Sequence, residues 1–236
     1  PALVGLNNGN FVVSWFGYSD ASDAGIFQRV VGNAADFPRQ TAPVIVDLTS
    51  SVTFLENQIN DTPQLIDPGI GLIDPDSANF AGGRLDVSYV TPYGNPDQFD
   101  IPGINAQDQL GIRNEGVGVD QIGVSGGNVT YNFGDGAGAV VIGSILSDGV
   151  NGKALTVVFN ANATPEAAEA LIENLTYQNL LSNPEPSRTI SLSLSDGDGG
   201  VTAPKAITIN ITAQPDGAVP FGAEKVVNTT TPGTQD

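Results

Sequence analysis

The sequence predicts an all-β protein on three observations. Glycine and proline are abundant, with 29 and 16 of the 236 residues, and both favour turns between short strands. Several segments alternate apolar and polar residues, as antiparallel strands with one buried face do. Hydrophobic residues make up 40% of the chain and charged residues 14%, which is enough apolar content for a folded core. We therefore expect an antiparallel β-sandwich.

The N-terminal part, residues 1–41, begins with a predicted hairpin. Two apolar runs flank Asn8-Gly9, a dipeptide typical of tight hairpin turns. A third strand is expected at 26–31. Three strands alone bury an apolar face poorly, so we interpret this part as one piece of a small, incomplete β-domain.

The longer predicted domain is residues 42–213, and eight of its segments have strand character. They are residues 44–48, 84–90, 121–124, 128–133, 139–146, 154–159, 189–194 and 206–212. One short helix is expected from Pro165 to Asn174, because Thr164 suits the N-cap and proline suits the first helical position. Leu171 and Ile172 should face the core. The remaining residues, 214–236, are predicted to form a linker and tail.

Charge and composition remove several function classes. Acidic residues outnumber basic ones 26 to 8, for a net charge of -18, and such a surface repels nucleic acids and anionic membranes. The chain has no Cys, His or Met, so it lacks disulfides, the usual zinc ligands and the Ser-His and Cys-His catalytic pairs. No segment approaches the ~20 apolar residues of a membrane span. We expect no enzymatic activity and no membrane insertion, and any metal must be bound through oxygen.

Two pairs of carboxylates are candidates for such a metal. Asp74 and Asp76, and likewise Asp196 and Asp198, stand two residues apart in turn-rich stretches. In a loop this spacing can aim both side chains at one ion, and Ca²⁺ takes 6 to 8 oxygen ligands. For the second pair, a plain turn in which Asp and Gly suit the backbone is an equal alternative. Neither pair belongs to a twelve-residue EF-hand loop.

Other functions remain open from these residues. Paired carboxylates also flank the sugar bond in glycosidases, although no aromatic-lined acidic cleft is evident in the sequence, so a polysaccharide-active enzyme is a distant alternative. Residues 16–18 and 89–93 contain aromatic side chains that would suit a ligand surface. Ordinary packing in the core explains them more simply.

Six segments resemble, in order, the cadherin-like repeats of large bacterial surface proteins and RTX-type adhesins. They are residues 54–57, 72–83, 108–112, 121–126, 160–164 and 195–200. The resemblance implies a cadherin-like, Ig-like β-sandwich with calcium bound near one end. It also implies that Glu56, Asp74 and Asp76 are ligands, with Asn79 as a further candidate. Asp196 and Asp198 match a second acidic segment of these repeats.

The two ends of the chain resemble a single second motif, a short all-β repeat of the same class of proteins. Its first part lies at 222–230, and its remainder lies at 11–15 and 25–29. The resemblance implies one period of a head-to-tail array, in which the tail of one unit completes the small sheet of a neighbouring copy. Covalent tandem repetition and noncovalent polymerisation both fit this arrangement.

Together these features predict an extracellular, cell-surface function. We expect a structural repeat of a calcium-stiffened surface fibre, surface layer or giant adhesin. The alternative is an adhesin domain that binds a surface glycan or protein.

Overall fold

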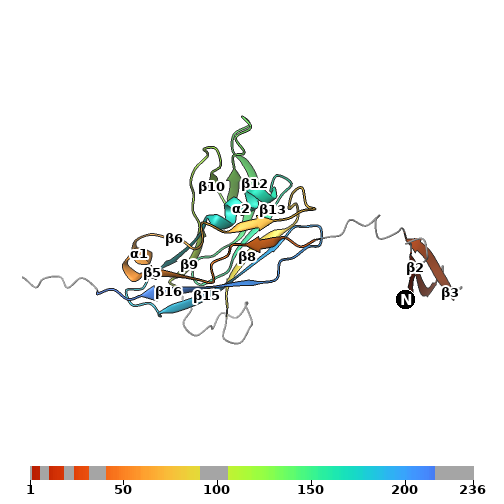
Figure 1. The fold of residues 1–236 in the computed structure, drawn as a ribbon, viewed down its shortest axis with the longest axis horizontal. Coiled ribbons are helices and arrows are strands. Elements are labelled where there is room, and N and C mark those ends of the chain that lie inside the picture. Colours follow the sequence, from red (N-terminus) through yellow and green to blue (C-terminus); the bar gives the residue numbers. More distant parts are fainter. Residues whose placement is uncertain (1, 6–10, 19–23, 32–40, 91–105, 216–236) are drawn as a thin grey trace, which may run out of the picture.

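The computed structural model describes residues 2–5, 11–18, 24–31, 41–90 and 106–215 (Figure 1). The N-terminal strands β1 (Ala2–Gly5), β2 (Phe11–Tyr18) and β3 (Ala24–Val31) form an antiparallel sheet in that order. Gly5 pairs with Phe11, so the predicted hairpin is confirmed. The Asn8-Gly9 turn itself lies outside the described residues.

The larger domain is built on an eight-stranded sheet. Its order is β10 (Ile122–Ser125), β11 (Asn128–Tyr131), β12 (Val140–Asp148), β13 (Leu155–Phe159), β8 (Arg84–Tyr89), β15 (Ser187–Ser195), β16 (Lys205–Thr212) and β5 (Ser51–Leu55). Neighbours pair in antiparallel fashion except β16 and β5, which are parallel. Along β15 alternate residues are buried, as expected for a strand with one face on the core.

A second layer covers this sheet (Figure 1). It contains the three-stranded sheet β6 (Gln64–Leu65), β14 (Leu175–Asn179) and β9 (Asp108–Ile112), the pair β4 (Val44–Val46) and β7 (Gly71–Ile73), and the helices α1 (Glu56–Asp61) and α2 (Pro165–Glu173). Buried side chains of both layers, such as Leu85, Leu192, Leu110 and Tyr177, belong to one core. The protein is therefore an all-β sandwich, as the sequence predicted.

All eight strands predicted for this domain are present, and their ends differ from the prediction by two residues at most. Helix α2 begins as expected, with the Thr164 side chain accepting a hydrogen bond from the Ala167 N–H. Leu171 and Ile172 are buried. Tyr89 is also buried, so the packing interpretation of this aromatic residue is confirmed.

A second short helix, α1, also forms, which the sequence analysis did not predict. Its six residues contain one buried apolar side chain, Ile59, which is too little to produce a helical periodicity in the sequence. Within the described ranges, no helix combines the length and the apolar character needed to cross a membrane.

Candidate metal centre

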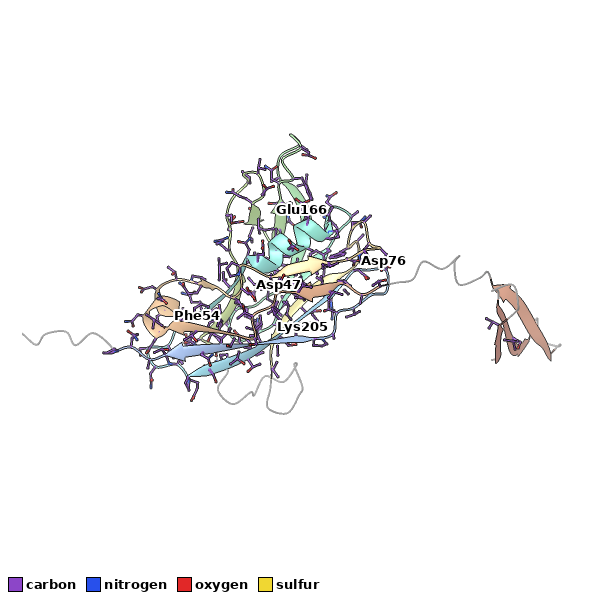
Figure 2. The ribbon with its side chains drawn as sticks, in the orientation of Figure 1. Asp47, Phe54, Asp76, Glu166 and Lys205 are labelled. Carbon is purple, nitrogen blue, oxygen red and sulfur yellow. The ribbon has the colours of Figure 1, made fainter. Side chains whose placement is uncertain are left out.

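Strand β16 defines two ends of the sandwich. Its first residue, Lys205, pairs with β15 near the end of that strand, and its last residue, Thr212, pairs with Leu55, which precedes Glu56. Eight residues of strand span roughly 26 Å. We call the end with Thr41 and Asp196 the N-terminal pole, and the end with α1 the C-terminal pole. Figure 2 labels Asp76 and Phe54 at these opposite ends.

This arrangement changes the grouping of the predicted ligands. Glu56 lies at the C-terminal pole, whereas Asp74 and Asp76 follow β7 at the N-terminal pole. The resemblance implied that Glu56 and these aspartates share one calcium site. The structure does not bring them together. Instead it places the two aspartate pairs beside each other, because the charges of Asp74 and Asp76 both act on Asp198.

Two loops in close backbone contact build the N-terminal pole. A Cβ on Gly83 would overlap the Ser195 carbonyl, and a Cβ on Gly197 would overlap the Ala81 carbonyl. Gly197 also has φ +88°, which disfavours any L side chain. The contact holds the loop after β15 against the loop after β7, so side chains from both loops share one pole.

Asp196 is the most enclosed of these carboxylates, with 1% of its surface exposed. Its Oδ1 accepts three backbone hydrogen bonds, from Asp198 at 3.0 Å, Gly199 at 3.1 Å and Gly200 at 2.9 Å. Its Oδ2 is buried and has no hydrogen-bond partner within the described part of the chain. A Cβ on Gly200 would overlap this same oxygen and approach the Ala42 backbone, so the Asp196 carboxylate packs closely against a position that only glycine can occupy.

Asp74 shows the same asymmetry. Its Oδ1 accepts the N–H groups of Asp76 and Ser77 at 3.3 and 3.1 Å. Its Oδ2 and the Ser77 hydroxyl are buried, and neither has a hydrogen-bond partner among the residues that the structure describes. An ionised carboxylate oxygen buried without a donor is costly unless a cation compensates it.

Asp76 and Asn79 have different roles. Asp76 is exposed, and its Oδ2 accepts the Thr41 N–H at 2.8 Å, which ties the incoming chain to the pole. The Asn79 Oδ1 accepts the Ala81 N–H at 3.1 Å, so this oxygen already stabilises its own turn.

The aspartates repel one another. A side-chain hydrogen bond with Asp196, then burial, then the charges of Asp196, Asp76 and Asp74 raise the pKa of Asp198 above its usual value. A divalent cation bound among these carboxylates would offset their mutual repulsion.

As the side chains stand, no three acidic residues in the described segments are arranged to hold a metal ion. Asp76 and Asp198 are exposed, and exposed side chains change rotamer within nanoseconds. Asp74 and Asp196 are fixed by their backbone hydrogen bonds. The pole thus combines two fixed carboxylates with two that can turn toward them, all with the oxygen donors that calcium prefers.

The C-terminal pole has one buried carboxylate. Glu56 is 1% exposed, and its Oε2 accepts the Gln214 N–H at 2.8 Å where the chain leaves the sandwich. Its Oε1 and the Asn60 Oδ1 are buried, and neither is hydrogen-bonded to a described residue. At both poles, therefore, a carboxylate accepts a hydrogen bond from a connecting segment, and a buried carboxylate oxygen has no hydrogen-bond partner among the described residues.

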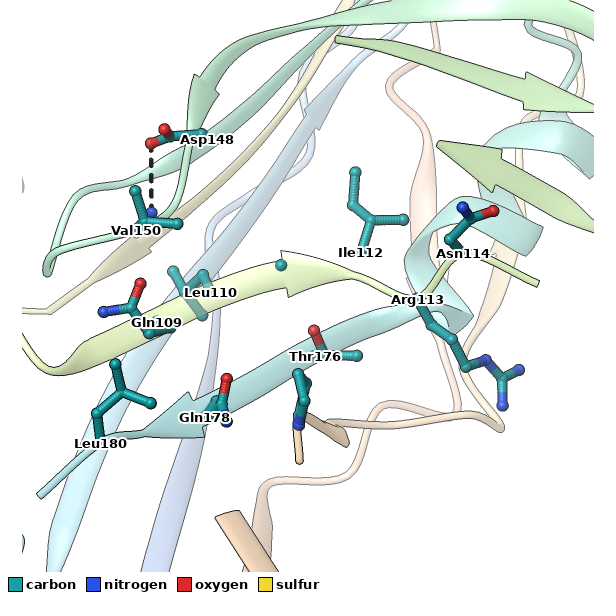
Figure 3. Close-up of a pocket in the computed structure, with 12 residues that line it drawn as sticks. Gln109, Leu110, Ile112, Arg113, Asn114, Asp148, Val150, Thr176, Gln178 and Leu180 are labelled. Carbon is teal, nitrogen blue, oxygen red and sulfur yellow. Dashed lines mark hydrogen bonds between the residues drawn. The ribbon is translucent and has the colours of Figure 1, made fainter. Parts of the chain in front are cut away.

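A shallow pocket of about 510 Å³ lies over β9 and β14 (Figure 3). The Gln109 side chain bonds to the Ala106 carbonyl and the Asn151 N–H, and Asp148 accepts the Val150 N–H. No aromatic residue and only one acidic residue stand among the described residues that line it. It is therefore unlike the two-carboxylate cleft of a glycosidase.

The sequence analysis missed a buried ion pair between the two sheets. The Arg188 Nε donates to Asp108 Oδ1 at 2.9 Å, and both side chains are almost fully buried. The Tyr177 hydroxyl and the Asn179 amide donate to the same oxygen at 2.6 and 2.8 Å. The only feature of the sequence that could have indicated this ion pair is the charged residue Arg188 at a position of strand β15 that faces the core. Because these groups bond to one another, we interpret them as structural.

Comparisons with protein-family models, with curated proteins and with solved structures gave no match. The cadherin-like resemblance therefore stays a prediction from the sequence segments.

Proposed function

We propose that this chain is a calcium-binding structural module of an extracellular surface protein, and that calcium stiffens its junctions with the neighbouring segments. One observation carries the proposal: each pole has a buried carboxylate oxygen without a hydrogen-bond partner among the described residues, and a carboxylate that accepts a hydrogen bond from the connecting backbone. At the N-terminal pole the bonded residue is Thr41, and at the C-terminal pole it is Gln214. A cation at either pole would thus act where the chain enters or leaves.

The donor set favours a hard divalent cation. The candidate ligands are carboxylate, amide and hydroxyl oxygens of Asp74, Asp196, Ser77, Glu56 and Asn60. Calcium accepts irregular arrangements of 6 to 8 oxygens, whereas magnesium requires near-octahedral geometry at shorter distances. We therefore propose calcium rather than magnesium as the physiological ion.

Bound calcium would oppose the repulsion within a chain of net charge -18. Extracellular modules commonly bind calcium with dissociation constants of about 0.1 to 1 mM. Junction stiffness would then depend on the calcium content of the medium, which suits a surface fibre, surface layer or giant adhesin. Head-to-tail assembly through residues 214–236 belongs to the same proposal, although most of that tail lies outside the described residues.

Calorimetric titration with calcium, on protein from which a chelator has first removed metal ions, tests this function. Asp196→Asn keeps an oxygen acceptor for the three backbone amides but removes the charge beside Gly200, so we expect at least ~10-fold weaker binding at one site. Glu56→Gln should weaken a second, separate site. Calcium at a hundredfold excess over its dissociation constant should stabilise the native protein by about 2.7 kcal/mol.

Asp67→Asn is the matched control. Asp67 is also a buried loop aspartate, but its two oxygens accept the Thr49 and Gly69 N–H groups at 2.7 and 3.2 Å. This variant should bind calcium like the unmodified chain. Equal loss of binding in Asp67→Asn and Asp196→Asn would sink the proposal, because it would trace the effect to general destabilisation.

The adhesin alternative has weaker support. The pocket over β9 and β14 is open, but the polar groups of Gln109 and Asp148 bond within the chain, and ligand sites need polar groups that remain available. We therefore propose a structural role ahead of ligand binding.

A further inference from the structure

Three exposed apolar side chains border the aspartates of the N-terminal pole. Val44 is 48% exposed, Ile73 is 54% exposed and Val201 is 59% exposed. Val44 and Ile73 pair directly across β4 and β7. We call these three residues the apolar rim.

The apolar rim and the aspartates are neighbours in the chain. Ile73 immediately precedes Asp74, and Val201 immediately follows Gly200, whose N–H binds Asp196. Single exposed apolar residues are ordinary on a protein surface. Three of them around a charged cluster, at the point where the chain enters the sandwich, indicate a surface that another element covers.

The chain itself supplies an element for this surface. The sheet of β1, β2 and β3 ends at Val31, and residues 32–40 connect it to Thr41, which is tied to Asp76. Such a connection reaches at most ~35 Å, which keeps the sheet near the pole at an effective concentration of about 1 mM or more. A sheet from a segment of about 30 residues buries little apolar surface by itself, and Val4 in β1 is exposed.

We propose that the sheet of β1, β2 and β3 docks on the apolar rim, and that calcium bound at the adjacent aspartates permits this docking. The calcium part rests on the function proposed above. Covering the rim brings apolar groups against Asp74, and desolvating an uncompensated carboxylate is costly. A bound cation removes that cost, so the apolar contact and the ion act together at one junction.

The test compares rotational correlation times of the two parts by ¹⁵N NMR relaxation on the whole chain. With calcium, amides of β2 and β15 should report the same correlation time. In Val44→Thr/Ile73→Thr, which keeps β-branched side chains, the value for β2 should fall by about twofold or more while calorimetry still shows calcium binding, weakened only by the loss of its coupling to docking. Val117→Thr/Val119→Thr is the control, because these valines are also exposed, at 70% and 60%, but lie in the loop before β10.

Independent tumbling of β2 in the unmodified chain with calcium would overturn the docking, even if calorimetry still shows calcium binding. If β2 and β15 still report the same correlation time in Val44→Thr/Ile73→Thr, the docking on the rim is overturned as well. Correlation times that rise with protein concentration would assign the rim to a second copy of the chain instead. If calcium fails to bind but the rim variant still separates the two parts, the proposed function fails while the docking stands.

Discussion

At the scale of single residues, the buried polar groups differ in how completely they are bonded. Tyr177 donates to Asp108 at 2.6 Å. The Tyr89 hydroxyl is buried and has no hydrogen-bond partner among the described residues. Burial, then the charge of Asp108, raises the pKa of both tyrosines above the usual value. Both phenols are therefore neutral at physiological pH, but only one of them compensates the aspartate.

This contrast predicts that two similar substitutions change the free energy of unfolding by different amounts. Tyr177→Phe leaves Asp108 with one donor fewer in a buried site and should cost about 1.5 to 3 kcal/mol. Tyr89→Phe removes an unbonded hydroxyl and should change the free energy of unfolding by less than about 0.5 kcal/mol. Urea denaturation of both variants measures the difference. A larger loss for Tyr89→Phe than for Tyr177→Phe would contradict the bonding described here.

Tyr131 provides a prediction about pH. Its hydroxyl donates to Glu166 at 3.2 Å, and burial, followed by the Glu166 charge, raises its pKa to about 12. The folded pKa exceeds the unfolded value of about 10, so the folded state binds more protons between these values. Its contribution to stability is therefore complete below pH 10 and is lost as the pH rises toward 12.

Alkaline denaturation of Tyr131→Phe tests this directly. The difference in stability between the unmodified chain and the variant should shrink as the pH rises from 10 to 12, because only the unmodified chain loses this contribution. Urea midpoints measured at half-unit pH intervals would give the comparison. Parallel curves across this range would show that Tyr131 ionises at its ordinary pKa.

At the scale of elements, the sequence predicted those whose pattern is local. Strands such as β15 alternate strictly over nine residues, and α2 carries Thr164 and Pro165 at its start. The sequence analysis did not assign β5, β6, β7, β9 and β14, which have two to five residues each, because such short segments contain too little periodicity. They form by pairing with strands that are distant in the sequence.

The candidate site shows the same division. The acidic residues could be selected from spacing and resemblance, but their grouping could not. Asp74 and Asp196 are far apart in the chain, and the contact between Gly83 and Ser195 that joins their loops depends on strand order in the large sheet. Ser77 and Asn60 gave no signal, since Ser and Asn are common in turns.

This loop contact predicts the effect of one glycine substitution. Gly197→Ala would require an alanine at φ +88° and would push its Cβ into the Ala81 carbonyl. We expect a loss of at least ~2 kcal/mol in the free energy of unfolding, together with weaker calcium binding at the N-terminal pole. The control is Gly126→Ala in the turn between β10 and β11, where φ is +59° but nothing lies near the added Cβ.

Thermal denaturation in chelator would rank the two variants. Gly197→Ala should unfold at a clearly lower temperature than Gly126→Ala, because it adds a steric overlap to the backbone strain. Equal midpoints would mean that the two loops separate easily, and the N-terminal pole would then not be a fixed site.

At the scale of the whole molecule, the sandwich has incompletely bonded acidic groups at its two ends. Inside it, the ion pair of Arg188 and Asp108 joins the sheets. Glu56 and Asp196 lie where the chain leaves and enters. This distribution suits a module whose core folds without metal and whose junctions respond to it.

The most direct test is a crystal structure of the chain grown with calcium, with an anomalous difference map. We predict a calcium peak at the N-terminal pole, about 2.3 to 2.6 Å from oxygens of Asp74 and Asp196. Asp76 or Asp198 should be turned toward the same ion. A map without a peak at this pole, at calcium concentrations of ~10 mM, well above those typical of extracellular sites, would contradict the central claim.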